Sequence, residues 1–530
     1  MPSYRRRATD IRRSLEEFEK TQFIATVIQY LNEDGLSRLD FAGRMPHLCF
    51  LLIEWRFQAE RTEGRRECTP SDISRLVRKL SDLQPIAMAG PGQRIDHLGL
   101  SRMMISQYWF QEHPVVWNYE IVRYHLLLLG QGASTWFREA FYNETDVNLN
   151  DFLMFCLALN AYFQHKNGLL AYGSLISLFV PHYDINYLAK MISLFGGKFT
   201  DIEAKLGEFY EQSVGENDYF RETRLMDFPI ILSESRALVI HKTVSSRGIG
   251  RIVAKILKRV DSQKFRKKFT KEFEKHVNGL ADGLSGDLVL ESEIREDLVR
   301  QGKRSKVVDC YLTQDDFELF IDAKGVEPKD SLKYSGNVDT VRRALTDNIL
   351  KGVEQACETK LNYSSKANKI EERFVVVVVN EALPFSYGAG LERAVGGVFD
   401  SVRATYGEVF KPENIFFLAI DEFEGMVALE QKEGISVWDL LQYAAAASST
   451  PKTAKYRFRQ FFWDLTGERN GERKSPIATD QMAELSSGIL NDVETIAEEC
   501  SEFWRTRGTI DQRVRLFIQL LNVLNQKIGV

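Results

Sequence analysis

The sequence predicts an α/β fold, with a mixed sheet flanked by helices in the middle of the chain and helical regions on either side. Near residue 245 the apolar pattern changes from one amphipathic helix after another to the succession helix, strands, helix, strand. The run RFVVVVVNEAL consists largely of β-branched residues, which is typical of a strand covered on both faces. Together these observations favour a layered α/β domain over a purely helical protein.

Helical spacing dominates the first part of the chain. Segments such as SLEEFEKTQFIATVIQYLNEDG and SDISRLVRKLSDLQ place apolar residues three and four apart, with a glycine or proline stop nearby. We therefore expect a large all-α N-terminal region over residues 1–245, split in two near the break AMAGPGQR at 87–94. Residues 246–426 are expected to hold the sheet, and residues 427–530 to form a helical C-terminal region.

The elements of the central region follow in a definite order. KFRKKFTKEFEKHVNGL predicts a helix with an apolar stripe formed by Phe265, Phe269, Phe273 and Val277. LVLESEI fits either a strand or a helix start, and VVDCYL and FELFIDAK alternate like a hairpin pair around TQDD. TVRRALTDNILKGVEQACETKL predicts one amphipathic helix, and NIFFLAIDEFEG predicts one further strand after the valine-rich run.

Composition and motifs exclude several classes of protein. The chain has 530 residues, 8 histidines and 6 scattered cysteines without a CxxC pair, so neither a zinc cluster nor a disulfide framework is expected. No GxxxxGK[ST] and no GxSxG occurs, which excludes a P-loop motor and a serine hydrolase of that type. The sequence shows neither a secretory signal nor an apolar run of about 20 residues, so we expect a soluble cytoplasmic protein.

Charged residues interrupt both strands of the predicted hairpin, where a buried strand normally carries valine or isoleucine. Asp322 and Lys324 lie two residues apart and share one face of their strand, and the hairpin can bring Asp309 beside Asp322. Two desolvated carboxylates repel each other, and a divalent cation removes that conflict. Mg²⁺ prefers carboxylate, water and phosphate oxygens, so the pattern indicates phosphodiester hydrolysis. The alternative is a structural ion pair at the edge of the sheet.

Asp309 on one strand and IDAKG at the end of the next resemble the PD-(D/E)xK nuclease superfamily. The upstream EFEKHVNGL is similar to the first motif of that superfamily, a helix with an acidic residue after an aromatic one. The resemblance covers about residues 262–422, with Val308 in place of the proline that names the motif. It implies a restriction-endonuclease-like αβββαβ core and a nuclease that depends on Mg²⁺, with Mn²⁺ as the alternative ion.

The resemblance also implies roles for individual residues. The implied catalytic residues are Glu274, Asp309, Asp322, Lys324 and Gln355, of which the three acids bind metal. Lys324 is implied to orient water and to stabilise charge on phosphorus. Gln355 matches a glutamine that many members carry on the helix after the third strand. Glu291 and Glu293 in LESEIREDL are alternatives to Glu274 as the first acid.

Basic residues are concentrated between Arg247 and Lys275. In RIVAKILKRV they fall on one helical face, and apolar residues make up the other. Because this face leads into the helix of Glu274, we expect it to contact the backbone of a nucleic acid, which depends on charge more than on sequence. The residues expected to bind nucleic acid are Arg251, Lys255, Lys258, Arg259, Lys264, Arg266, Lys267 and Lys268.

These features predict a metal-dependent endonuclease that hydrolyses phosphodiester bonds, with DNA favoured over RNA by resemblance. A nuclease with a large helical region and no helicase motor suits bacterial antiviral defence. The alternatives are a non-catalytic nucleic-acid-binding or sensor protein with a degenerate nuclease fold, and a toxin-like effector that cleaves RNA or tRNA. No membrane partner is expected, and the other partners left open are a second copy of the chain and a protein trigger.

Overall fold

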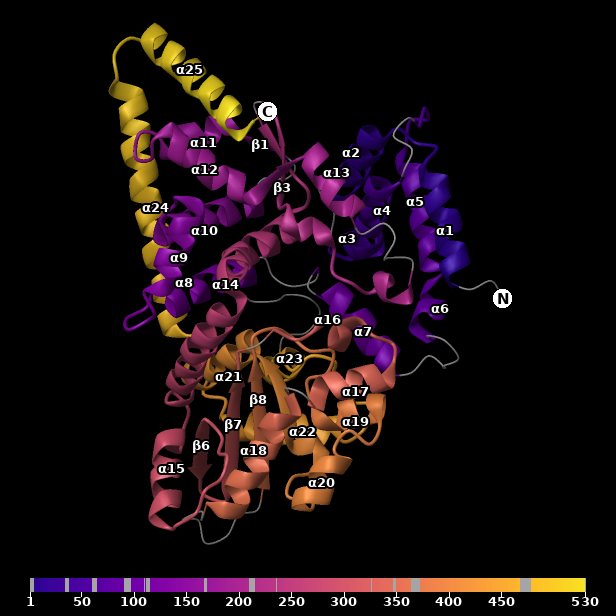
Figure 1. The fold of residues 1–530 in the computed structure, drawn as a ribbon, viewed down its shortest axis with the longest axis vertical. Helices are drawn as coiled ribbons and strands as arrows, with labels where there is room; N and C mark the ends of the chain where they lie inside the picture. Colours follow the sequence, from indigo (N-terminus) through magenta and orange to yellow (C-terminus); the bar gives the residue numbers. More distant parts are fainter. Residues whose placement is uncertain are drawn as a thin grey trace. The chain divides into compact units, whose positions relative to one another are not determined.

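The chain forms two compact units in a computed structural model (Figure 1). The structure describes residues 4–33, 38–59, 64–89, 97–108, 110, 115–165, 169–208, 215–234, 236–325, 327–346, 349–363, 372–467 and 478–529. Unit 1 comprises Met1–Ile86, Gln107–Phe265 and Gln481–Val530. Unit 2 comprises Ala87–Ser106 and Arg266–Asp480 and carries all the residues predicted for catalysis.

This division differs from the three regions expected from the sequence. The break at 87–94, of which residues 90–94 lie outside the described chain, does coincide with a change of unit. Residues 87–106 join unit 2, where Arg102 donates a hydrogen bond to Tyr334 O at 3.2 Å. The boundary expected near 245–250 lies inside a helix, and the unit changes at residue 265 instead. Residues 481–530 belong to unit 1, because their last helix packs on helices of that unit.

Unit 1 is mostly helical. Its first helices are α1 (Tyr4–Leu15), α2 (Lys20–Leu31), α3 (Arg38–Gly43), α4 (Pro46–Gln58), α5 (Pro70–Ser81) and α6 (Gln84–Ala89), which ends in unit 2. Next come α8 (Val115–Leu129), α9 (Trp136–Thr145), α10 (Leu149–His165), α11 (Tyr172–Phe179), α12 (Ile185–Phe195), α13 (Phe199–Gly207), η1 (Glu216–Tyr219) and η2 (Arg224–Asp227). The last are α24 (Asp480–Thr506) and α25 (Ile510–Ile528), and α25 packs against α11 and α12. Of the helices described in either unit, none combines the length and the apolar character needed to cross a lipid bilayer.

The expectation of an all-α N-terminal region is wrong, because unit 1 contains a small four-stranded sheet. Its strands, in the order β1-β4-β3-β2, are β1 (Leu169–Ala171), β4 (Arg236–Val239), β3 (Ile230–Ser233) and β2 (Gly196–Lys198). β3 and β4 form an antiparallel hairpin with Ser233 opposite Arg236, whereas β2 runs parallel to β3. Strands of three or four residues are too short to show the period-two alternation on which their prediction depends.

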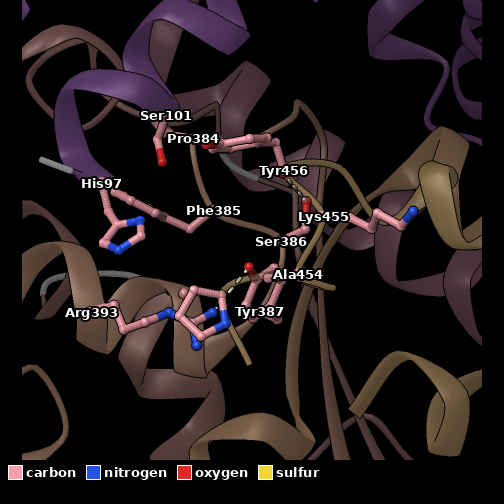
Figure 2. Close-up of a pocket in the computed structure, with 12 residues that line it drawn as sticks. His97, Ser101, Pro384, Phe385, Ser386, Tyr387, Arg393, Ala454, Lys455 and Tyr456 are labelled. Atoms are coloured by element: carbon pink, nitrogen blue, oxygen red, sulfur yellow. Dashed lines mark hydrogen bonds between the residues drawn. The ribbon is translucent and has the colours of Figure 1, made fainter. Parts of the chain in front are cut away.

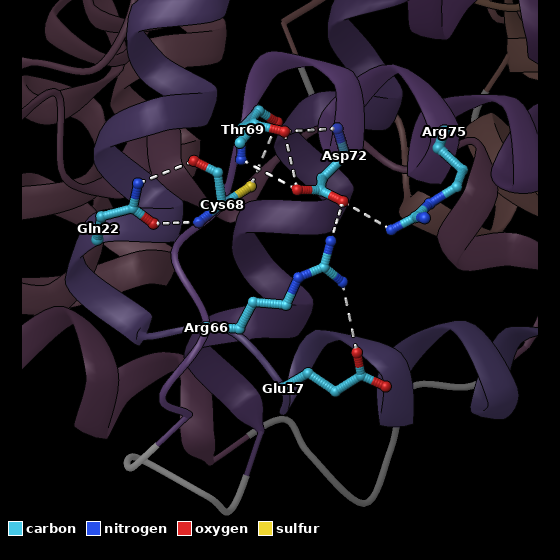
Figure 3. Close-up of polar contacts among 7 residues, drawn as sticks. All are labelled: Glu17, Gln22, Arg66, Cys68, Thr69, Asp72 and Arg75. Carbon is cyan, nitrogen blue, oxygen red and sulfur yellow. Dashed lines mark hydrogen bonds and ion pairs between the residues drawn. The ribbon is translucent and has the colours of Figure 1, made fainter.

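Polar contacts fix the start of helix α5 in unit 1 (Figure 3). Thr69 and Asp72 form a capping box, in which each side chain accepts a hydrogen bond from the backbone of the other. Arg66 and Arg75 both donate to Asp72 Oδ1 at 2.7 Å. Gln22 binds the backbone N and O of the residue before Thr69 through its amide. This cluster is therefore accounted for by helix capping.

Helix α14 (Lys242–Ala281) runs from unit 1 into unit 2 and bends at Asp261, whose backbone angles are extended rather than helical. Asp261 Oδ1 accepts a hydrogen bond from Lys264 N at 2.9 Å, so this side chain caps the helix that resumes after the bend. The four residues of the predicted apolar stripe are all buried. The helix predicted over 264–280 is confirmed.

Unit 2 contains a five-stranded sheet in the order β5-β6-β7-β8-β9. The strands are β5 (Asp287–Leu290), β6 (Cys310–Gln314), β7 (Phe317–Lys324), β8 (Glu372–Val379) and β9 (Ile415–Ala419). The helices are α7 (His97–Tyr108), α15 (Glu291–Arg300), α16 (Asp330–Tyr334), α17 (Val338–Thr346), α18 (Ile349–Asn362), α19 (Gly388–Val395), α20 (Asp400–Tyr406), η3 (Pro412–Asn414), α21 (Ile420–Glu433), α22 (Val437–Ser448) and α23 (Arg459–Thr466). The mixed α/β class predicted for this part of the chain is confirmed.

The topology of this sheet contains the predicted hairpin. β6 pairs with β5 and β7 in the antiparallel direction, and Cys310 lies opposite Ile321. β8 runs parallel to β7, and β9 runs parallel to β8. α16, α17 and α18 lie between β7 and β8 in the chain and supply the crossover that parallel pairing requires. Every residue of the valine run 375–379 is 0% exposed, so the prediction of a doubly covered strand is confirmed.

Three segments differ in detail from their expected forms. LVLESEI is both the end of β5 and the start of α15. The single helix expected over 340–361 is two helices, α17 and α18, and residues 347 and 348 between them lie outside the described chain. The strand expected over 414–425 ends at Ala419, whose backbone N donates to Glu422 Oε2 at 3.1 Å. That contact starts α21, because it satisfies a donor at the helix terminus.

Helices cover both faces of the sheet of unit 2 (Figure 1). On one face α18 comes very close, since a Cβ added at Gly352 would lie 2.9 Å from Val377 Cγ2 and 2.7 Å from Asp322 Oδ2. On the other face the Phe416 ring packs against Phe458, just before α23, with ring centroids 5.4 Å apart. The centre of the sheet is therefore dry, and a charged group there needs a specific partner.

Replacing Gly352 with alanine should destabilise unit 2, because the new methyl group would lie 2.7 Å from Asp322 Oδ2 and 2.9 Å from Val377 Cγ2. Overpacking of this kind costs about 1–3 kcal/mol of unfolding free energy. Gly279→Ala is the matched control, since Gly279 is also helical and its added Cβ meets nothing within 4 Å. That change should stabilise by about 0.5–1 kcal/mol. Urea unfolding measures both variants, and equal stabilities would contradict the close approach of α18.

Candidate functional site

The two aspartates of the hairpin come just beyond the last residue pair of β6 and β7. One step along the antiparallel ladder from the pair Cys310 and Ile321 come Asp309 and Asp322. Residues opposite each other in such a ladder project from the same face. Asp309 Oδ2 also accepts a hydrogen bond from Ala323 N at 2.6 Å, and the two aspartates are 9% and 0% exposed. The structure therefore brings Asp309 and Asp322 together in a buried position.

The two alternative first acids have different surroundings. Glu291 continues the row of acids, because its backbone N donates to Asp309 O at 2.9 Å beyond the last pair of β5 and β6. Its carboxylate forms an ion pair with Arg295 at 2.5 Å. Glu293 Oε2 instead accepts a hydrogen bond from Leu290 N at 2.9 Å, which caps α15. The structure thus brings Glu291 to the site and engages Glu293 at the helix end.

Glu274 approaches the same residues from helix α14. Burial and the charges of Glu291 and Asp322 raise the pKa of Glu274, and the ammonium of Lys324 acts in the opposite direction. The helix comes close to the strand end because Gly325 has no side chain, and an added Cβ would lie 3.0 Å from atoms of α14. Glu274 and Glu291 therefore both lie within electrostatic reach of Asp322.

Lys324 ends β7 between a carboxylate and an amide. Its Nζ lies 2.5 Å from Asp322 Oδ2 and donates a hydrogen bond to Gln355 Oε1 at 2.8 Å. Gln355 Nε2 in turn donates to Val307 O at 2.9 Å, so the amide is fixed at both of its polar atoms. The structure places the predicted Gln355 in direct contact with Lys324, where it sets the direction of the ammonium.

Sequence reasoning missed a residue of α18 that holds the backbone leading to Asp309. Thr359 is fully buried, and its Oγ1 accepts a hydrogen bond from Val308 N at 3.0 Å. Gly352, Gln355 and Thr359 follow one another at spacings of three and four, so they share one face of the helix. This spacing of small and polar residues in a helix beside the sheet is the signal that points to them.

Burial and neighbouring negative charge raise the pKa of both aspartates. Burial and the charge of Asp322 raise the pKa of Asp309 to about 8, although the hydrogen bond from Ala323 N and the ammonium of Lys324 favour the ionised form. Burial also raises the pKa of Asp322, against the attraction of Lys324. At neutral pH the two carboxylates therefore resist being ionised together unless a further cation joins them.

Another buried carboxylate on β7 shows a fully satisfied charge in the same sheet. Glu318 Oε1 accepts hydrogen bonds from Tyr311 Oη at 2.6 Å and Lys360 Nζ at 3.0 Å, and Oε2 accepts one from Arg373 Nε at 2.9 Å. Asp322 lies four residues along the same face of the strand. Its Oδ1 is buried with no hydrogen-bond partner among the described residues. The hydrogen bonds of Glu318 account for its burial, whereas the described residues give Asp322 Oδ1 no hydrogen-bond partner of the kind that a buried carboxylate requires.

Asp322 offers an oxygen of the kind that a hard divalent cation binds. Mg²⁺ takes carboxylate oxygens, and a buried oxygen without a donor is a natural ligand for it. Among the described residues no group of three or more His, Cys, Asp or Glu side chains is placed to hold a metal ion, and Asp322 is paired with Lys324. A cation would satisfy Asp322 Oδ1 and relieve its repulsion with Asp309. Either Glu274 or Glu291 could supply the third carboxylate.

The basic residues expected to bind nucleic acid are largely engaged inside unit 1. Ion pairs of 2.7, 2.9 and 2.8 Å join Arg251 to Glu222, Lys255 to Asp227 and Arg259 to Glu144. The ammonium groups of Lys258 and Lys264 lie over the rings of Phe265 and Trp136. In unit 2, Arg266 and Lys267 are exposed and Lys268 is half-buried. The first part of the basic run is therefore a surface whose cations pair with acids or lie over rings, whereas Arg266 and Lys267 are exposed on the part of α14 that leads to Glu274.

The arrangement suits the attack of water on an electrophile that carries negative charge. Carboxylates from two strands and a helix can hold a cation, and an amine fixed by an amide can stabilise developing charge. No protein-family model, no curated protein and no solved structure matches this chain. The assignment of function rests on the chemistry of the site itself.

Two substitutions on β7 should separate a structural carboxylate from the candidate site. Glu318→Gln leaves Lys360 and Arg373 without their charge partner and should cost about 3–5 kcal/mol of unfolding free energy. Asp322→Asn takes the charge partner from Lys324, but Lys324 keeps its hydrogen bond to Gln355 and the repulsion with Asp309 is removed, so the change should cost less than about 1 kcal/mol or stabilise the fold. Guanidinium unfolding measures both variants. An equal cost for the two would assign Asp322 to a structural ion pair.

The pKa of Asp309 predicts that this residue makes the metal-free fold less stable as pH rises. Its carboxyl titrates near 3.8 without the fold and at about 8 within it, so stability is fully present below the lower value and is lost toward the higher one. Asp309→Asn keeps an acceptor for Ala323 N and removes the titration. In chelator, the melting temperature of the wild type should fall relative to this variant between about pH 5 and pH 8. Parallel pH profiles for the two proteins would contradict the shift.

Proposed function

We propose that unit 2 is a metal-dependent nuclease domain of the PD-(D/E)xK type, which hydrolyses phosphodiester bonds. The observation that carries the proposal is the facing pair Asp309 and Asp322 beside Lys324, with a buried oxygen of Asp322 that no described group satisfies. A structural ion pair accounts for one aspartate beside Lys324. It does not account for a second buried acid on the same face.

The succession of elements supports the same proposal. α14 precedes β5, β6 and β7, and α18 and β8 follow, which is the αβββαβ order of the restriction-endonuclease-like core. α15, α16 and α17 are additional helices within that order. Agreement of topology is an argument by analogy, so it supports the proposal but does not replace the argument from the site residues.

Asp309 and Asp322, together with Glu274 or Glu291, would hold Mg²⁺ or Mn²⁺. Such an ion, when bound, polarises a phosphoryl group and lowers the pKa of a bound water. Contacts within the protein already hold both aspartates in place. Asp309 accepts a hydrogen bond from Ala323 N, and α18 encloses Asp322. Preorganised carboxylates of this kind lower the cost of assembling the reactive site.

Lys324 is the amine next to the reacting phosphate in this proposal. Its ammonium can orient a water molecule and stabilise the negative charge that develops on the phosphate oxygens. Gln355 is a positioning residue, because it contacts Lys324 and is anchored on Val307 O. Loss of Gln355 should therefore affect the reaction only through the position of Lys324.

Exposed cations on the second half of α14 suit the backbone of a nucleic acid. Arg266, Lys267 and Lys271 are exposed and precede Glu274 by at most eight residues, or about 12 Å along a helix. Contacts between such residues and phosphates depend on charge rather than on base sequence. DNA is the favoured substrate on the ground of the superfamily resemblance alone.

The full-length protein should cleave nucleic acid in Mg²⁺ or Mn²⁺ and remain inactive in chelator. Plasmid DNA, linear duplex DNA, single-stranded DNA and tRNA as substrates distinguish a DNA nuclease from an RNA-cleaving effector. Asp309→Asn, Asp322→Asn and Lys324→Ala should each lower the rate about 10²-fold or more, because each removes a ligand or a charge-stabilising group.

Three further variants sharpen this experiment. Glu293→Gln is the matched control and should keep its activity within a few-fold, because Glu293 caps α15. Glu274→Gln and Glu291→Gln identify the first acid, since loss of the ligand should raise the Mg²⁺ concentration needed for activity. Cleavage that survives both Asp322→Asn and Lys324→Ala, or no metal-stimulated cleavage of any of the four substrates, would contradict the proposal.

A further inference from the structure

Unit 2 contains a second polar hollow, away from the row of acids. A cavity of about 90 Å³ lies between α7, the loop after β8, α19 and the segment after α22 (Figure 2). Polar and aromatic side chains that line it include His97, Ser101, Phe385, Tyr387, Arg393 and Tyr456. No aspartate or glutamate is among the described lining residues, so the hollow suits an anion rather than a metal ion.

Arg393 brings positive charge to this cavity. Its Nη1 and Nη2 each donate to Ser448 O at 3.1 Å, and Nη2 also donates to Tyr387 Oη at 3.2 Å. Both partners are neutral, and within the described chain no acidic side chain pairs with this guanidinium. The other basic residue of the lining, Lys455, pairs with Asp464 at 2.7 Å and extends away from the hollow in Figure 2. A half-buried guanidinium held by neutral groups is ready to bind an anion.

Ser101 supplies a hydroxyl without a hydrogen-bond partner among the described residues. The residue is 6% exposed, and its Oγ makes no hydrogen bond to any group that the structure describes. Figure 2 shows this hydroxyl directed into the hollow from α7. His97, one helical turn earlier, is exposed beside it. Buried hydroxyls normally find a hydrogen-bond partner, and an oxygen of a ligand would complete this one.

The register of the sheet relates this cavity to the candidate active site. Asp322 lies opposite Val377, Val377 lies opposite Phe417, and Phe417 N donates to Ser386 O at 2.9 Å. Ser386 lines the cavity and is therefore three strand spacings from Asp322, or roughly 15 Å at about 4.8 Å each. One strand of a duplex presents a phosphate every ~3.4 Å along the helix axis, so a duplex whose axis followed this line would place roughly four phosphates of that strand between the two sites.

We propose that this cavity binds the phosphate group of a nucleotide, with Arg393, His97 and Ser101 as donors. The rings of Tyr387 and Tyr456 would lie beside the attached sugar or base. The volume of about 90 Å³ is well below the roughly 300–1,000 Å³ of sites that enclose drug-sized ligands, so only the phosphate is enclosed. The preference for an anion follows from the lining, whereas the choice of a nucleotide rests on the proposed nuclease function.

The phosphate comes either from the 5′ end of a nucleic-acid strand or from a free nucleotide. Fluorescence anisotropy with the full chain in chelator, where no cleavage occurs, compares single strands of about 10 nucleotides with a 5′-phosphate or a 5′-hydroxyl. The phosphorylated strand should bind about tenfold more tightly, the effect of one charge-assisted contact. Arg393→Met and Ser101→Ala should reduce this preference to less than about twofold. Lys455→Met is the matched control and should retain the preference, because Lys455 is paired with Asp464.

AMP and inorganic phosphate identify the source of the group. If they raise the melting temperature only when Arg393 is present, while both strands bind equally, the ligand is the phosphate of a free nucleotide. The absence of any Arg393-dependent response to the phosphorylated strand, AMP or phosphate overturns the proposal. Ser101→Ala provides an independent test if Arg393→Met does not fold, since this change breaks no hydrogen bond with any residue that the structure describes. Asp322→Asn should leave the preference intact, so this site is tested even in a protein without nuclease activity.

Discussion

The incomplete compensation of one buried carboxylate, that of Asp322, is the constraint around which unit 2 is organised. Its strand β7 lies between antiparallel β6 and parallel β8, and α18 passes over it at Gly352, so the side chain of Asp322 is fully buried. Lys324 supplies one cation, and Asp309 adds a second acid instead of a donor. An interior that places acids together in this way is unfavourable by itself and becomes favourable when a cation binds.

At the other end of β7, Glu318 is a buried carboxylate whose charge is fully compensated. Glu318 is equally buried, but a tyrosine, a lysine and an arginine saturate its oxygens, so nothing further is required there. Proteins usually satisfy buried polar groups, and exceptions concentrate where function requires them. The comparison of Glu318 with Asp322 therefore separates a carboxylate that serves the fold from one that is available for a ligand, and it needs no related protein. The same argument applies to the cavity at Arg393. Among the described residues this guanidinium donates to neutral groups and has no acidic side chain to balance its charge.

Periodic patterns were sufficient to predict the core of unit 2 but not its assembly. The hairpin, the valine strand and the stripe of α14 follow from local alternation, which packing reinforces. The resemblance implied a site role for Gln355 but not its contact with Lys324, since residues 31 apart meet only through tertiary packing. The short strands of unit 1 and the division of residues 340–361 into two helices leave no clear periodic signal. Residues 481–530 belong to unit 1 because their last helix contacts α11 and α12. No local sequence pattern predicts these contacts.

The interleaving of the two units has a consequence for the order in which they fold on the ribosome. Unit 2 ends at Asp480, so its whole sequence is available before synthesis finishes. Unit 1 begins at the first residues but needs the last segment, Gln481–Val530, before α25 can cover α11 and α12. At roughly 5–20 residues per second, its earliest helices wait on the order of half a minute or longer for these partners. Unit 2 can therefore fold first. Unit 1, whose segments precede and follow unit 2 in the sequence, completes its fold after it.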